Sequence, residues 1–275
     1  SMISKFSAGK FWEQADTSKV TWFSVVPTII SHLLHNDTNP SLAVTERLRF
    51  GRSASSALAV ETQSAFEDRF KVPIVETMGL TETAAQILSN PLPPGTRKIG
   101  SPGIGYGNEV CILTPELTVA PANQEGEIAI RGPNVMLEYL HNPEATQQTF
   151  AGDWLRTGDL GRVDEDGYVF VTGRLKELII KGGENIAPRE IDEVLYSEPD
   201  IIEAAAFARP CKSYGETVEA AVAVKPGSTL SAEALLDLCQ KRLGKFKSPD
   251  VIHFMSELPK GPSGKIQRLK LGDLL

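Results

Sequence analysis

The stretch from Thr172 to Glu190 most constrains how this chain can fold, because the sequence has a different character on its two sides. It contains a Gly182-Gly183 pair, and glycine allows the positive φ of a tight turn. Pro188 follows, and proline suits the first position of a helix because no hydrogen bond is lost there. We expect a joint between two bodies here, built as strand, turn and helix. An ordinary connection between neighbouring elements is the alternative when this stretch is taken alone.

Before the joint, strand-like and helix-like runs alternate. This alternation predicts a parallel α/β sheet. Ligands of such sheets bind at the carboxyl ends of the strands, where Ser53–Ser56 and Thr77–Thr83 stand. The predicted strands are Lys19–Val26, Leu48–Arg52 and Val72–Glu76, and the predicted helices begin at Pro27 and cover Leu58–Phe70.

From Gly95 to Thr172 the pattern changes to short β runs between glycines and prolines. This pattern predicts a small antiparallel β subdomain or barrel. The glycine-rich segment Gly103–Gly107 could suggest a dinucleotide-binding loop, but it precedes a strand run and no helix follows it, so we predict a turn. The β runs are Val110–Leu113, Gly126–Arg131 and Tyr168–Val171.

After Arg174 the chain has about 100 residues, the size of a small domain, with helix and strand patterns that predict an α+β fold. Ser231 is the expected N-cap of its second helix. The predicted fold is therefore a multidomain α/β and α+β protein, divided into residues 1–97, 98–173 and 174–275. The predicted elements of the last part are helices Pro188–Tyr196 and Ala232–Leu243 and strands Ala204–Ala208, Ala220–Val224 and Val251–Phe254.

Composition excludes several classes of function. A net charge of −7 and a pI near 5.3 argue against a general nucleic-acid or anionic-membrane binder. The three cysteines are widely spaced, which argues against a zinc site or a disulfide framework and favours a reducing compartment. His32 and His35 share a helical face, but no acidic or cysteine partner accompanies them, so we predict a solvated or packed pair rather than a metal site.

Four short motifs occur along the chain, and their order and separation are informative. They are Met78–Glu82, Thr157–Asp159, Gly173–Lys176 and Pro259–Lys265. Together they resemble the adenylate-forming superfamily of acyl-CoA synthetases, luciferases and nonribosomal adenylation domains, and the likeness covers nearly the whole chain. The resemblance implies two half-reactions. A carboxylic acid and ATP give an acyl-adenylate, and the thiol of coenzyme A then displaces AMP. Small carboxylic acids, ATP and CoA are the expected partners, with Mg²⁺ as the expected cofactor.

The resemblance assigns the charged residues of these motifs. Lys265 is the implied catalytic lysine, which brings an ammonium group to the α-phosphate and the carboxylate. Glu82 is the implied Mg²⁺ ligand, and Thr81 a phosphate contact. Asp159 would accept both ribose hydroxyls, with Arg174 as a second ribose contact. Each role has an ordinary structural alternative. Lys265 could be a solvated lysine, and Glu82 an acid at the start of a helix. The segment Thr157–Asp159 could be a common polar turn.

The same resemblance outlines an adenine site. The family places an aromatic residue where this chain has Met78, so a thioether is expected to lie on the base, with Gly79 beside it. Glu76 stands where a side chain often meets the adenine amino group. Ser55 and Ser56 belong to the segment that forms the other wall of the adenine and acyl pocket. A helix-capping turn is the alternative for that segment, and both can be true.

The resemblance also implies functions for residues of the joint between Thr172 and Glu190. Lys176 matches the hinge about which the C-terminal domain rotates between the half-reactions. Lys181, Gly182 and Gly183 are then expected to line the tunnel for CoA. An exposed charge without a hinge function is the alternative for Lys176.

The phosphate loop that the family carries well before its Val-Pro-Thr segment, here Val26–Thr28, does not appear. We therefore expect residues 1–97 to be part of a larger AMP-binding domain, residues 174–275 to be its mobile C-terminal domain, and this region alone to have little or no activity. The nearest likeness is to oxalate:CoA ligases, but Ala85 stands where those carry a histidine, which argues against oxalate.

Two other functions stay open at this stage, namely an adenylation domain that loads a carrier protein and a non-catalytic fragment with a docking surface. No membrane-spanning run or signal peptide is seen. A cytoplasmic location is expected, with a peroxisomal one as the alternative if a C-terminal signal lies beyond Leu275.

Overall fold

The first of three five-stranded sheets has the order β1-β2-β3-β4-β5 in the computed structural model, which describes residues 6–275. Its first three strands are parallel, as the strand and helix alternation predicts, and the last two are antiparallel. The strands are β1 (Trp22–Val25), β2 (Phe50–Ser53), β3 (Ile74–Leu80), β4 (Ala85–Ser89) and β5 (Ile104–Gly105), and the helices are α1 (Ala8–Thr17), α2 (Pro27–Leu34), α3 (Leu42–Arg47) and α4 (Val60–Phe70).

Two predictions for this sheet need correction. Strand β3 runs on to Leu80 instead of ending at Glu76, so only Thr81–Thr83 forms a turn of 3₁₀ helix. The segment Gly103–Gly107 is not a simple turn, since β5 lies within it and pairs with β4. A Cβ atom on Gly103 would lie 2.0 Å from the backbone of Ser89, so the missing side chain lets these segments approach.

Aromatic side chains hold the helices against this sheet. Trp12 of α1 lies 5.0 Å, centroid to centroid, from Phe70 of α4, and Phe23 of β1 contacts Trp12 and Phe66 edge-on. Such edge-to-face pairs add to the free energy gained by burying the rings. Ile30 joins the same cluster and anchors α2, whose opposite face is left free for other contacts.

The second sheet is antiparallel, as predicted, with the order β10-β9-β7-β6 and β8 paired to β9. Its core includes Ile128 and Ile130, and Ile87 and Leu88 of β4 pack into the same cluster. The first two sheets therefore share buried apolar surface. The elements are β6 (Glu109–Leu113), β7 (Gly126–Arg131), α5 (Pro143–Thr149), β8 (Phe150–Ala151), β9 (Trp154–Val163) and β10 (Val169–Arg174).

The third sheet and its two long helices form the α+β body that the sequence predicts. Ser231 caps the second of these helices, accepting a hydrogen bond from the backbone N–H of Ala234. The helical segment runs on to Lys247, but Gly244, with a non-helical φ of 75°, breaks it directly after the predicted end at Leu243. The elements are β11 (Ile179–Lys181), β12 (Glu184–Ile186), α6 (Pro188–Tyr196), β13 (Ile201–Cys211), β14 (Gly215–Val224), α7 (Ala232–Lys247), β15 (Val251–Phe254) and α8 (Leu271–Leu274).

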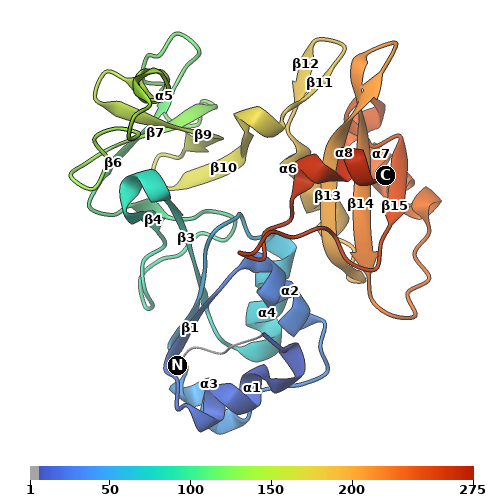
Figure 1. Ribbon diagram of the computed structural model, residues 1–275. Helices are drawn as coiled ribbons and strands as arrows, with labels where there is room; N and C mark the ends of the chain where they lie inside the picture. The colour runs from blue at the N-terminus through green and yellow to red at the C-terminus, as the bar shows by residue number, and fades with distance from the viewer. Residues whose placement is uncertain (1–5) are drawn as a thin grey trace.

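The predicted joint has the expected local structure. A 3₁₀ turn (Leu175–Glu177) leads from β10 into the β11–β12 hairpin, where φ is 60° at Gly182 and 87° at Gly183. Pro188 is the first residue of α6. Figure 1 shows the three sheets as three bodies, with the segment between β15 and α8 crossing from the third body toward α2. The division at residues 97 and 173 stays a prediction. No helix in residues 6–275 has the length and apolar character to cross a membrane.

Candidate functional site

A cavity of about 310 Å³ lies where the three bodies meet. The end of β3 and the loop after β2 form one wall, and β9 and β10 form a second. Helices α2 and α6, strand β13 and the segment after Gly264 complete the lining. The position agrees with the expectation that ligands bind beyond the carboxyl ends of parallel strands. Eight of the residues singled out in the sequence line it: Ser55, Ser56, Glu76, Met78, Gly79, Asp159, Arg174 and Lys265.

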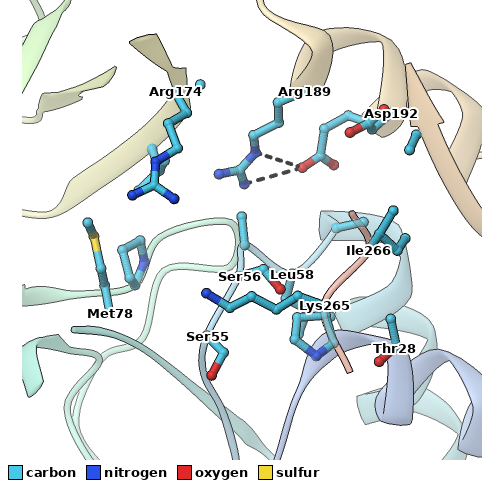
Figure 2. Close-up of a pocket in the computed structure, with 18 of the residues that line it drawn as sticks. Thr28, Ser55, Ser56, Leu58, Met78, Arg174, Arg189, Asp192, Lys265 and Ile266 are labelled. Carbon is cyan, nitrogen blue, oxygen red and sulfur yellow. Dashed lines mark hydrogen bonds and ion pairs between the residues drawn. The ribbon is translucent and has the colours of Figure 1, made fainter. Parts of the chain in front are cut away.

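The β3 wall of the cavity depends on close backbone contact. A Cβ atom on Gly79 would lie 1.7 Å from the carbonyl oxygen of Ala85, so only glycine fits beside β4. Met78 faces the cavity from the preceding position (Figure 2). Ser55 and Ser56 lie opposite, and Ser55 has a φ of 83°, which is uncommon for a residue with a side chain. Met78 and the two serines therefore line the same cavity from separate segments of the first sheet.

Glu76 is a buried acid at the base of this wall, only 2% exposed. Its Oε1 accepts a hydrogen bond from the backbone N–H of Leu58 at 3.1 Å, while Oε2 has no hydrogen-bond partner among residues 6–275. Burial raises the pKa of Glu76 to about 7, opposed by the charge of Arg189. An unpaired oxygen at the base of a polar cavity suits a hydrogen bond to a bound amino group.

Asp159 and Arg174 face each other across β9 and β10. Arg174 Nε lies 3.3 Å from Asp159 Oδ1. Burial raises the pKa of Asp159, and the charge of Arg174 opposes that shift. The pair therefore presents a carboxylate and a guanidinium on the same side of the cavity, and both groups hydrogen-bond to sugar hydroxyls readily.

Lys265 stands at the end of a loop that enters the cavity from the third body. A β-bridge between Lys260 and Ile266 closes the loop, and Thr28 Oγ1 of α2 donates to the carbonyl oxygen of Gly264 at 3.1 Å. Figure 2 shows the Lys265 side chain extended across the cavity toward Ser55. The loop thus brings an ammonium group to the serine-lined wall.

Glu203 anchors the root of that loop and was missed in the sequence. Its side chain is 1% exposed, and it accepts hydrogen bonds from Lys260 Nζ (2.8 Å to Oε1), the backbone N–H of Leu258 (2.9 Å) and His32 Nε2 (3.0 Å). Burial acts to raise the pKa of Glu203, but these three donors outweigh it and hold the pKa below the usual range. The prediction that His32 has no acidic partner is therefore wrong, because its partner lies 171 positions further along the chain.

Helix α2 makes a row of contacts with the third body. Besides Thr28 and His32, Ser31 Oγ donates to the carbonyl oxygen of Ile202 at 2.6 Å, and His35 Nε2 lies 3.2 Å from that of Pro199. These four side chains are spaced at i, i+3, i+4 and i+7, so they occupy one face of the helix. This face positions the lysine loop relative to the first sheet.

A second set of charges that the sequence did not single out closes the cavity on the α6 side. Arg268 Nη2 lies 2.6 Å from Asp192 Oδ2, and its Nε lies 3.0 Å from Glu177 Oε2. Burial acts to lower the pKa of Arg268, but the two carboxylates outweigh it and raise the pKa above the usual range. In the sequence, the only feature that could have pointed to Arg268 as a site residue was its position three residues after Lys265.

The other six predicted site residues lie outside the cavity lining: Thr81, Glu82, Lys176, Lys181, Gly182 and Gly183. The Glu82 Oε1 atom accepts a hydrogen bond from the Tyr139 hydroxyl at 2.8 Å. The Lys181 side chain is buried, with Nζ 3.8 Å from Asp250 Oδ1 and 5.6 Å from the ring centroid of Phe246. Lys176 is exposed in the turn after β10. Their assigned roles stay predictions.

Comparison with known proteins agrees with this architecture. Residues 2–140 match the family model "AMP-binding enzyme", and residues 190–265 match "AMP-binding enzyme C-terminal domain". The chain is 48% identical to a sulfoacetate–CoA ligase of Cupriavidus necator over 98% of its own length and 53% of the relative's. It is 42% identical to an oxalate–CoA ligase of Arabidopsis thaliana, over 96% of this chain and 52% of that one. The chain therefore spans about half the length of these curated relatives.

Among solved structures, ATP-bound MatB from Rhodopseudomonas palustris superimposes with a TM-score of 0.89 at 31% identity, over 99% of this chain and 55% of that one. The apo form of the same protein gives a TM-score of 0.74 at 32% identity, over 99% of this chain and 54% of that one. The nucleotide-bound form of that protein thus superimposes on this chain better than its apo form does. With a family match over half of its residues and the matching motifs around one cavity, this chain belongs to the AMP-binding enzyme family.

Proposed function

We propose that the protein works as an AMP-forming acid:CoA ligase. One observation carries the proposal: Lys265, the Asp159–Arg174 pair and the Met78-Gly79 wall come from three separate bodies and line a single cavity. Each of these residues alone has an ordinary structural explanation. Their convergence on one cavity supports the proposal that Lys265 meets the phosphate, the Asp159–Arg174 pair the ribose and Met78 the base of one nucleotide.

In the first half-reaction, a carboxylate oxygen of the acid attacks the α-phosphorus of ATP. A bond forms between them, the bond to pyrophosphate breaks, and an acyl-adenylate results. Lys265 offsets the negative charge that builds on the α-phosphate and holds the attacking carboxylate against it. Asp159 and Arg174 hold the ribose, and Glu76 accepts a hydrogen bond from the adenine amino group. These contacts act mainly by positioning.

In the second half-reaction, the thiol of CoA attacks the acyl carbon and AMP leaves with the electrons of the broken bond. Lys181, Gly182 and Gly183 are proposed to line the path of the thiol. In the arrangement described here they lie outside the cavity, so this role requires the third body to turn about the segment at Lys176.

Mg²⁺ is proposed to be held by Glu82 together with phosphate oxygens. Mg²⁺ commonly takes only one or two protein carboxylates alongside phosphates, and Glu82 Oε2 makes no hydrogen bond within residues 6–275. A single carboxylate therefore fits. When bound, the ion would neutralise charge on the phosphates.

The relatives narrow the acid to be tested. Sulfoacetate and oxalate each carry a second anionic group on a very short chain. Short acids with two anionic groups are therefore the proposed substrate class, with oxalate the less favoured member because of Ala85. A cytoplasmic location is proposed, with a peroxisomal one as the alternative.

The test is a pyrophosphate-release screen of the whole protein with ATP and Mg²⁺, with and without CoA, across short mono- and dianionic acids. Release that depends on one acid, together with a CoA thioester identified by mass spectrometry, is the expected result. Release with transfer to the pantetheine arm of a carrier protein but not to CoA would replace the proposal with carrier loading. An absence of nucleotide binding would point to a non-catalytic fragment.

A further inference from the structure

A second cavity of about 510 Å³ adjoins the first. The two share Thr28 and Ser55 in their linings, and the backbone from Pro262 to Gly264 forms part of the second one. A ligand with one end beside Lys265 can therefore extend past Ser55 into the second cavity. In this second lining, Ser55 belongs to the segment that the sequence assigned to the wall of the adenine and acyl pocket, and Arg52 was given no role.

The charges in the second lining are all of one kind. Among the described residues that form it, His32, Arg52 and Lys260 are basic, and none is an aspartate or glutamate. His32 and Lys260 are both paired with Glu203, which lies behind the lining. Arg52 is left as the cation without a carboxylate partner.

The surroundings of Arg52 also indicate that its charge lacks a counter-ion. The only side-chain hydrogen bond of Arg52 in residues 6–275 runs from Nη1 to Ser24 Oγ of β1 at 3.1 Å. The side chain is half-buried, and burial lowers the pKa of Arg52 with no acid opposing the shift. Taking a charge out of water without a counter-ion costs free energy, so such an arginine is expected to be matched by an anion.

We propose that the second cavity holds the far end of the acid and that Arg52 binds its second anionic group, a carboxylate or a sulfonate. The inference rests on the proposed ligase function. The planar guanidinium offers a pair of parallel N–H donors to such a group, while the reactive carboxylate meets Lys265 on the other side of Ser55. Arg52 would then select acids with two anionic groups over acids with one.

The experiment compares Arg52→Leu, Arg52→Lys and the parent in the whole protein, using pyrophosphate release with matched acids. Sulfoacetate, malonate and succinate are the dianionic probes, and propionate and butyrate are the monoanionic ones. Arg49→Leu is the control, because Arg49 precedes β2, is exposed, and lies outside both cavity linings. Thermal unfolding of each variant reports whether the fold is kept.

In the parent we expect kcat/KM to favour a dianionic acid. Arg52→Leu should lower that value roughly 10- to 100-fold, the effect of losing a charge-assisted hydrogen-bonded pair, and leave or raise the values for propionate and butyrate. The KM for ATP should stay within about twofold, and Arg52→Lys should retain part of the preference as a point charge.

Equal losses for both classes of acid in Arg52→Leu and Arg52→Lys would overturn the assignment and indicate a structural role, such as pairing with a carboxylate elsewhere in the protein. A parent that forms thioesters only from monoanionic acids would also overturn it while leaving the ligase function intact. A parent that activates no acid at all would instead remove the proposed function, and this assignment with it.

Discussion

The third body carries two turns rich in lysine and glycine, and only one of them lines the first cavity. The loop Pro259–Lys265 enters the central cavity, where Thr28 holds its tip and Glu203 its root. The β11–β12 hairpin with Lys181 lies outside the cavity lining, and Figure 1 shows it at the opposite end of the third body from that loop. One rigid body cannot present both turns to one cavity at once. The contrast agrees with the proposed turn of the third body, in which the present arrangement would serve acid activation and the other would serve thioester formation.

The largest expected effect tests the loop. Lys265→Ala should lower acid-dependent pyrophosphate release about 10²- to 10³-fold, because a donor aimed at developing charge is lost. Thioester formation from a supplied acyl-adenylate and CoA should change little. Lys241→Ala is the matched control, since that lysine is 71% exposed and pairs only with Asp237 one helical turn away. Equal losses in both half-reactions would contradict the assignment of the Lys265 loop to acid activation alone.

The next effect concerns the root of the loop. Glu203→Gln should destabilise the fold by roughly 1–3 kcal/mol, because its buried donors lose a charged acceptor. Since the pKa of Glu203 in the folded protein lies below its ordinary 4.5, this stabilisation is present above about pH 4.5 and is lost as the pH falls through the lower folded value. Denaturant unfolding at pH 7 and pH 4 measures both effects.

Two further readouts sharpen this test. Glu203→Gln should slow acid activation more than thioester formation, because it frees the loop that carries Lys265. His32→Ala removes only the donor from α2 and should give the same partition with a smaller loss of stability. Unchanged stability and unchanged half-reactions in Glu203→Gln would show that the loop is held by its other contacts alone.

A smaller effect is expected at the hairpin. Lys181→Met keeps an apolar stem beside Phe246 and removes the charge near Asp250. It should lower thioester formation from a supplied acyl-adenylate by about tenfold, the equivalent of 1.4 kcal/mol, and leave pyrophosphate release unchanged. Stopped-flow or quenched-flow measurement of each half-reaction separates the outcomes, and a loss confined to the first step would reverse the assignment of the two turns.

The smallest effect compares one glycine from each turn. Gly264 has a φ of 80° and Gly183 one of 87°, so alanine at either position costs roughly 1 kcal/mol of backbone strain. A Cβ atom on Gly264 would lie 3.3 Å from Val26 Cγ2, whereas one on Gly183 meets no atom within 4 Å. Gly264→Ala should therefore lose more stability than Gly183→Ala in thermal unfolding, and it alone should disturb acid activation. Equal effects would mean that the loop moves freely against α2.

Much of the fold followed from local signals. Pro188 at the start of α6, the positive φ of Gly182 and Gly183 and the cap at Ser231 were predicted because each depends on a few neighbouring residues. The boundaries were less reliable, as the extension of β3 to Leu80 shows, since pairing with β4 decides where that strand ends.

The residues of the candidate site also divide into those that local sequence identifies and those that depend on distant segments. The motifs around Met78, Asp159 and Lys265 could be found because each is a short run of sequence, and their order along the chain indicated the family. The partner of His32, the unpaired charge of Arg52 and the position of Lys181 against Asp250 could not, because each depends on segments that are distant in the sequence and meet only in the fold. The sequence by itself determined the local elements and the chemical groups available. Only the tertiary structure decided which charges have a partner and which have none, because burial and proximity depend on packing between distant segments.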